Sequence, residues 1–124
     1  MRTREISRSE WPAFFDSFSR QHEGWRITLE VFGPDIGDQI EERDLALEGV
    51  TAELADAGDE IEIMIGAKPD DHITHTISAP AQVGLEQTDE GADVALAIKA
   101  ADGTTTLLRF RSTVLPEMVD SVAI

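Results

Sequence analysis

The residues best suited to chemistry lie close together in the segment DDHITHTI, residues 70–77. It holds two histidines, His72 and His75, three positions apart and directly after two aspartates. On a helix this spacing would bring both imidazoles to one side, as a shared metal ion requires. The segment is rich in β-branched isoleucine and threonine, which favour a strand, where residues three apart point to opposite faces. We therefore expect no metal ion held jointly by the two histidines.

One smaller pair is compatible with a strand. Asp70 and His72 are two positions apart and share a face where the predicted strand begins. They could supply two metal ligands, or a base and its orienting carboxylate. Two ligands are fewer than zinc needs, and the others would have to come from elsewhere, such as His22. His75 is expected on the apolar face as a core histidine with a hydrogen-bond partner. We name Asp70 and His72 as candidate ligand-binding residues and predict no metal.

A second candidate is a pair of arginines near the end of the chain. Arg109 and Arg111 share the face opposite Phe110, and two guanidinium groups there could bind a carboxylate or a phosphate. The favoured alternative is a cross-strand ion pair, because the predicted register sets Arg111 directly opposite Asp93. We keep both arginines as candidate ligand-binding residues.

Catalytic signatures are missing from the sequence. There is no GxSxG, no Walker loop, no GxGxxG and no HExxH, and the absence of cysteine excludes disulfides and thiolate nucleophiles. The stretch from Asp35 to Glu62 has eleven acids and one base, so carboxylate pairs could be chosen from it at will. A solvated acidic rim is the simpler interpretation. We predict no catalytic residue and no cofactor.

Net charge limits the partners. The chain has 25 acids and 10 bases, a net charge of −15, and residues 27–108 alone carry −16 while residues 1–26 carry +1. Such a field repels nucleic acids and anionic membranes, so neither is an expected partner. Three readings remain open: capture of a cationic partner, mimicry of nucleic acid, and the favoured one, solubility or adaptation to salt. No apolar run suits a signal peptide or a membrane-spanning helix, so we expect a cytoplasmic protein.

The first element predicted is an amphipathic helix over residues 7–23. Its apolar face is formed by Trp11, Phe14, Phe15 and Phe18. These positions follow the i, i+3, i+4, i+7 spacing of a helix that covers a core. Ser7 and Glu10 have the spacing of a capping box at its start, and Gly24 is placed to end it in a left-handed conformation.

Beyond Gly24 the apolar period changes to two, which indicates strands. The predicted strands cover residues 25–32, 45–54, 59–67, 72–78, 81–88, 93–100 and 104–111. The charged segment 33–44 reads as a loop, and the parity of the apolar residues switches at Gly49, which indicates a β-bulge. Connections this short suit an antiparallel meander and leave no room for crossover helices. The tail could begin a short helix at Pro116.

Parity also predicts how two hairpins pair, since a slip of one residue would turn an apolar face outward. Leu96 opposite Leu108 requires an odd loop, most simply residues 101–103 with Gly103 left-handed. In the preceding hairpin, Leu85 opposite Leu96 requires an even loop, either residues 90–91 or 89–92.

Four fragments, EWPAFFDSFSRQHEGW, HITHTI, QTDEGADVAL and DGTTTLLRF, together resemble a family of small bacterial proteins known only as a domain of unknown function. The likeness covers nearly the whole chain, so it implies a stand-alone cytoplasmic bacterial protein with no second domain. It implies no activity, cofactor or catalytic residue.

These observations predict a single α+β domain over residues 1–124. We expect an N-terminal amphipathic helix packed on a twisted, mostly antiparallel sheet of six or seven strands, either an open meander or a partial barrel. The favoured function is a non-enzymatic binding or protein-interaction module, with a small-molecule ligand that the sequence does not identify or a second copy of itself as partner. The alternatives are a small enzyme or ligand carrier with its site near Asp70 and His72, and an acidic mimic of nucleic acid.

Overall fold

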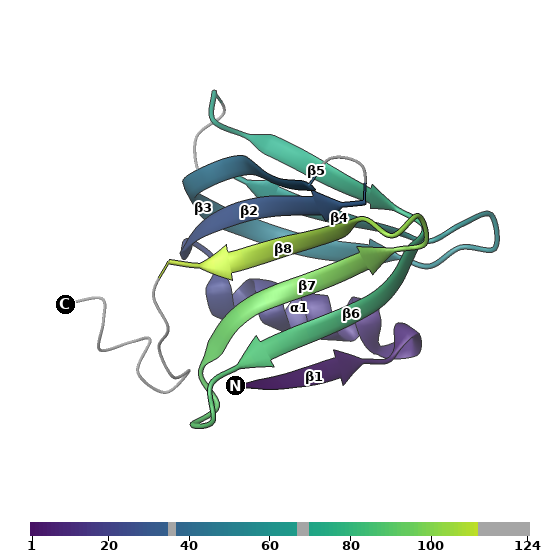
Figure 1. Cartoon of the computed structure of the whole chain (residues 1–124), viewed down its shortest axis with the longest axis horizontal. Coiled ribbons are helices and arrows are strands. Elements are labelled where there is room, and N and C mark those ends of the chain that lie inside the picture. Colours follow the sequence, from purple (N-terminus) through teal and green to yellow (C-terminus); the bar gives the residue numbers. More distant parts are fainter. Residues whose placement is uncertain (35–36, 67–69, 112–124) are drawn as a thin grey trace.

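A computed structural model describes residues 1–34, 37–66 and 70–111 of the chain. The elements are, in order, β1 (Arg2–Ile6), a 3₁₀ turn η1 (Arg8–Glu10), α1 (Trp11–His22), β2 (Arg26–Gly33), β3 (Gly37–Glu53), β4 (Glu60–Ile65), β5 (Ile73–Ser78), β6 (Pro80–Gln87), β7 (Asp93–Ala100) and β8 (Thr105–Phe110). In the described residues the helix α1 follows one short strand and precedes seven others, as Figure 1 shows. The helix predicted to begin at Pro116 lies outside the described residues.

The described strands form one eight-stranded sheet in the order β1-β6-β7-β8-β2-β3-β4-β5, and every neighbouring pair is antiparallel. The predicted α+β class and antiparallel sheet are confirmed. The predicted number of six or seven strands is too low, because β1 was not expected. Only Ile6 of its five residues is buried, so this edge strand lacks the alternating apolar pattern that predicts a strand from sequence.

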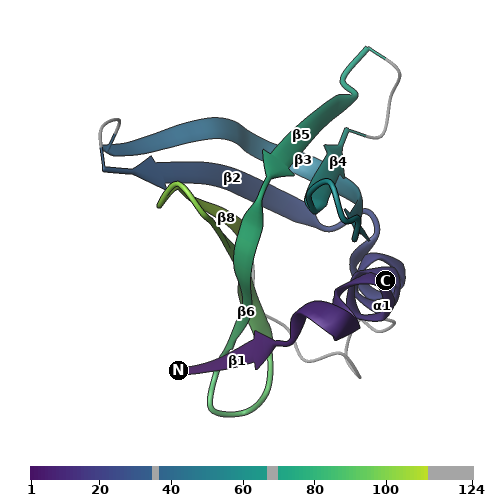
Figure 2. The ribbon, with the colours of Figure 1, turned by 90° about the vertical axis from the view of Figure 1, so that its right-hand side faces the viewer.

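The sheet is strongly curled, and a single residue connects its two ends. Only Ala79 separates β5, at one edge, from β6, beside the other edge. Its φ of 52° is left-handed, and both its N–H and its carbonyl are hydrogen-bonded to other backbone groups. Its N–H donates to the carbonyl of Asp59 over 3.2 Å, and its carbonyl accepts from the N–H of Ala101 over 2.8 Å. The curl stays open, and α1 occupies the open side between β1 and β4 (Figure 2).

Helix α1 packs its aromatic face on the sheet as predicted. Trp11, Phe15 and Phe18 are buried, and Phe14 is half-buried beside them. The helix ends at His22, and Gly24 follows with a φ of 87°. The predicted capping box is wrong: the side chain of Ser7 makes no capping bond, because a 3₁₀ turn comes first and joins the N–H of Glu10 to the carbonyl of Ser7.

Strand register follows the parity argument in the hairpin of β7 and β8. Leu96 lies opposite Leu108, and the N–H of Ala100 bonds to the carbonyl of Thr104, so the loop is the predicted three residues, 101–103. Gly103 has a φ of 93°, the left-handed position expected of it.

The hairpin of β6 and β7 keeps the predicted pairing but not the predicted loop. Leu85 lies opposite Leu96, yet the N–H of Thr88 bonds to the carbonyl of Ala92, so the loop is the odd set of residues 89–91. The predicted even loop is wrong. One extra residue, Val94, bulges from β7 and restores the parity that the odd loop would have reversed.

The long strand β3 corrects the loop predicted for residues 33–44. This segment pairs with β2 from Gly37 onward, with two register shifts along the ladder. These shifts interrupt the period-two pattern of side chains, so the sequence of this charged segment predicts a loop although the segment forms a strand. The bulge predicted at Gly49 is confirmed, since the register with β4 shifts between Leu47 and Gly49.

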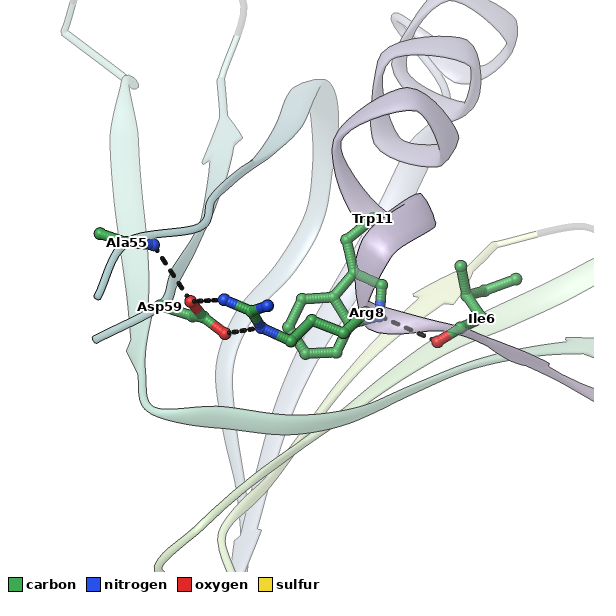
Figure 3. A network of polar contacts seen from close by, with 5 residues as sticks. All are labelled: Ile6, Arg8, Trp11, Ala55 and Asp59. Atoms are coloured by element: carbon green, nitrogen blue, oxygen red, sulfur yellow. Dashed lines mark hydrogen bonds and ion pairs between the residues drawn. The ribbon is translucent and has the colours of Figure 1, made fainter. Parts of the chain in front are cut away.

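Polar contacts join η1 to the connection between β3 and β4 (Figure 3). The guanidinium of Arg8 donates to both carboxylate oxygens of Asp59, over 2.6 and 2.8 Å. The N–H of Ala55 donates to the same carboxylate over 3.2 Å, and the indole N–H of Trp11 donates to the carbonyl of Ile6 over 2.9 Å. The hydrogen bonds from Arg8 outweigh the modest desolvation and hold the pKa of Asp59 below its usual range.

Asp59→Asn is expected to remove an acid-sensitive part of the stability. A carboxyl group with a lowered folded-state pKa stabilises the fold above its unfolded pKa, and that contribution is lost as pH falls through the folded value. The variant should therefore be less stable than the parent at neutral pH and should lose less further stability below about pH 4. Urea unfolding at several pH values measures both effects. Asp56→Asn, an exposed aspartate in the same connection, is the control; equal pH profiles for the two variants would contradict the assignment.

Candidate functional site

The strand assignment of residues 73–78 settles the geometry of the two histidines. Strand β5 exposes Thr74 and Thr76, while Ile77 is buried and His75 half-buried on the other face. His72 lies just before the strand, exposed, with Nδ1 2.9 Å from a carboxylate oxygen of Glu48. The two histidines thus lie on opposite faces, as predicted. In the ranges 1–34, 37–66 and 70–111 there is no cluster of three or more His, Asp or Glu side chains that could hold a metal ion.

The candidate arginines each have a carboxylate partner, that of Arg109 on the neighbouring strand β2 and that of Arg111 on β3, one strand further. Arg109 Nε lies 3.3 Å from a carboxylate oxygen of Glu30, and Arg111 Nη1 lies 3.3 Å from one of Asp44. The predicted pairing of Arg111 with Asp93 is wrong, because Asp93 turns inward at the Val94 bulge.

The four predicted site residues are not brought together. Three strands separate β8, next to the arginines, from β5, next to Asp70 and His72, or about 19 Å along the sheet at ~4.8 Å per strand. Asp70 and His72 are both exposed. Their roles, and those of Arg109 and Arg111, stay predictions.

The structure places a cleft elsewhere, between α1 and the strands β1, β6 and β7. Its volume is about 520 Å³, within the range of roughly 300–1,000 Å³ typical of small-molecule sites. The cleft is lined by Arg4, Ile6, Ser9, Glu10, Ala13, Phe14, Ser17, Phe18, Gln21, Leu85, Gln87 and Asp93. Five of these twelve side chains are aromatic or aliphatic and seven are polar or charged, so the cleft offers an apolar wall beside several hydrogen-bonding groups.

Strand alternation explains how an arginine comes to line this cleft. In β1 the side chain of Ile6 enters the core, so Arg4, two residues earlier, lies on the same inner face. Arg4 pairs with Leu85 across the ladder, and its guanidinium carbon lies 5.8 Å from the centre of the Phe14 ring. Arg4 makes no side-chain hydrogen bond or ion pair with any residue that the structure describes.

The inner end of the cleft is an ion pair between His22 and Asp93. His22 Nε2 lies 2.9 Å from Asp93 Oδ2, and the two side chains are only 2% and 7% exposed. The amide of Gln87 donates to the other carboxylate oxygen over 2.9 Å. The second ring nitrogen of His22 lies 2.8 Å from the carbonyl oxygen of Phe18. Every polar atom of the pair is therefore engaged within the protein.

The Val94 bulge is what brings Asp93 to this position. Leu96 and Ile98 point inward from β7, so strict alternation would turn Asp93 outward. The bulged residue reverses the alternation, and Asp93 joins Gln87, its neighbour across the ladder, on the inner face. The alternation of apolar residues in the sequence does not predict the pairing of His22 with Asp93. His22 does fall one helical turn beyond Phe18 on the predicted apolar face. That position was the signal for a buried histidine.

The hydrogen-bond partners determine where the protons lie. A carbonyl oxygen only accepts, so Nδ1 of His22 must donate to Phe18. Burial by itself raises the pKa of Asp93, but hydrogen bonds from His22 and Gln87, with the charges of His22 and Arg4, hold it below its usual range. An ionised Asp93 also only accepts, so Nε2 must donate as well. His22 therefore carries both protons and a positive charge.

Three aromatic rings surround this charge. The ring centres of Phe18, Trp25 and Phe110 lie 4.3, 4.6 and 4.8 Å from that of His22, and Phe110 is stacked on it. Aromatic faces at such distances attract a cation. Because both nitrogens of His22 are engaged and the ring is buried, it is not placed to exchange a proton with a ligand in the cleft.

Fold and cleft together describe an α+β protein whose antiparallel sheet curls around one aromatic helix and leaves a ligand-sized opening beside it. The chain belongs to the family of unknown function DUF5335, whose profile matches residues 2–118. An uncharacterised protein of the bacterium Aquifex aeolicus (strain VF5) is 30% identical over 118 residues, covering 94% of this chain and all of the relative. No solved structure is significantly similar to the chain. In the part of the chain that the structure describes, no helix is long and apolar enough to cross a membrane.

Asp93→Ala is expected to lower the free energy of unfolding by about 3–5 kcal/mol, because it leaves the charge of His22 buried and uncompensated. Chemical denaturation followed by circular dichroism measures the change. Glu90→Ala, an exposed acid in the loop of the same hairpin, should change stability by less than about 0.5 kcal/mol. A loss as small as that of the control would show that the pair contributes little.

Nitrogen NMR of the imidazole rings tests the protonation of His22. We expect both of its ring nitrogens to carry protons that donate to Phe18 and Asp93, and these N–H protons to be protected from exchange with water by burial. The exposed ring of His72 serves as an internal comparison, since its N–H protons should exchange quickly. A single protonated nitrogen on His22 would contradict the assignment and move the second proton to Asp93.

Proposed function

We propose that the protein is a non-enzymatic binding module that holds a small ligand in the cleft between α1 and the strands β1, β6 and β7. The observation that carries the proposal is a cleft of about 520 Å³ in which an apolar wall that includes Phe14, Phe18 and Leu85 lies beside the charged group of Arg4. Pockets that combine an apolar wall with a few fixed polar groups are the usual sites for small molecules.

The ionisable pair at the inner end supports binding over catalysis. A general acid or base must reach its substrate within hydrogen-bond distance. His22 uses both ring nitrogens inside the protein, and Asp93 accepts from His22 and Gln87. Their function in this proposal is to position Phe18 and the end of α1, which form one wall of the cleft.

Other functions predicted from the sequence have less support. An enzyme or carrier centred on Asp70 and His72 would use two exposed side chains, one of them already paired with Glu48. Self-association and mimicry of nucleic acid stay hypotheses, and the cytoplasmic location is part of the proposal.

Filling the cleft is expected to abolish binding. Ala13 is exposed on α1 and lines the cleft, so Ala13→Phe adds a ring to this space without disturbing the core. A neutral naphthylamine dye, whose fluorescence rises in apolar surroundings, should bind the parent protein, and Ala13→Phe should weaken this binding about tenfold or more.

Ala57→Phe, an exposed alanine in the β3–β4 connection, is the matched control and should bind the dye as the parent does. Dye binding that is unchanged in Ala13→Phe would place the site elsewhere. A parent protein that does not bind the dye would remove the main support for the proposal.

A further inference from the structure

We propose that the ligand of the cleft is a small amphiphile with a single carboxylate, whose head group binds the guanidinium of Arg4 and whose apolar body lies along Phe14, Phe18 and Leu85. This inference rests on the proposed function and adds the chemistry of the ligand. It requires an available cation, a local field that admits an anion, and an apolar wall next to the cation.

Arg4 is available because it has no partner within the described chain. Arg8, Arg20 and Arg109 each bond to a carboxylate. Arg4 instead lies over the Phe14 ring at 5.8 Å, at the wall of the cleft. A guanidinium stacked on an aromatic ring keeps its edge free, and that edge matches the two oxygens of a carboxylate.

The local field is more favourable to an anion than the net charge of −15 suggests. Most of the lining comes from residues 1–26, whose net charge is +1, while the acids concentrate in residues 27–108. The one buried acid of the lining, Asp93, is neutralised by His22. Arg4 acts on Asp93 only through its charge, with no hydrogen bond or ion pair between them, so its N–H donors are not engaged by a carboxylate of the described residues.

The same field limits the charge of the ligand to one. Glu10 also lines the cleft, and the acidic remainder of the molecule repels a dianion more strongly than a monoanion. An amphiphile with a single carboxylate satisfies Arg4 and covers the half-buried ring of Phe14. A neutral molecule of the same shape would cover the ring but leave the guanidinium without an anion.

Calorimetric titration with three molecules of one shape tests the inference: decanoate, decanol and decylammonium. We expect decanoate to bind at least tenfold more tightly than decanol, since a hydrogen bond to a charged group contributes about that factor or more. Decylammonium should bind most weakly. Arg4→Gln should reduce the affinity for decanoate at least tenfold and leave that for decanol within about twofold. Arg4→Lys should recover only part of the loss, because lysine restores the positive charge but not the two parallel N–H donors with which a guanidinium binds a carboxylate.

Arg2→Gln is the matched control. Arg2 lies on the same strand and the same face and is exposed like Arg4, but it does not line the cleft, so this variant removes the same charge and should bind decanoate like the parent. Equal affinity of the parent for decanoate and decanol, or an equal effect of Arg4→Gln on both, would overturn the carboxylate while leaving the cleft as a binding site. Failure of all three molecules to bind would overturn the proposed function together with this inference.

Discussion

A buried ion pair sets the relation between helix and sheet. His22 ends α1 and Asp93 begins β7, 71 positions further along the chain, and they meet where water is excluded. Two charges taken out of water are tolerated only when each is compensated. Gln87, the carbonyl of Phe18 and three aromatic rings provide that compensation, and they do so where the end of α1 meets the start of β7. The width of the cleft follows, because α1 is one wall and the sheet is the other.

Much of the fold could be predicted from elementary periodicity. The aromatic face of α1, the opposite faces of His72 and His75, and the pairing of Leu96 with Leu108 follow from side-chain alternation alone, because a wrong register would expose an apolar face. The bulge at Val94 could not be found this way. An odd loop plus one bulged residue gives the same parity as an even loop, so the apolar pattern fits both.

The candidate site was less predictable, for a different physical reason. Sequence reasoning selects residues whose types are chemically distinctive, and His72, Arg109 and Arg111 are distinctive in so acidic a chain. The structure places a carboxylate of β2 or β3 within 3.3 Å of each of them. Two charged residues of the cleft, Arg4 and Asp93, belong to no sequence motif. Arg4 lines it because β1 alternates, and Asp93 because a bulge reverses the alternation of β7.

The position of β1 at the edge of the sheet has a consequence for recognition. This strand has only β6 as a neighbour, whereas interior strands have two. Edge strands detach from a fold more easily than strands held on both sides. A molecule held by Arg4 can bind only while β1 is attached, so its apparent affinity is reduced by the fraction of time the strand is detached. The affinity for such a molecule is thus coupled to the fraying of the five-residue strand β1, and a bound molecule in return stabilises the attached state of β1.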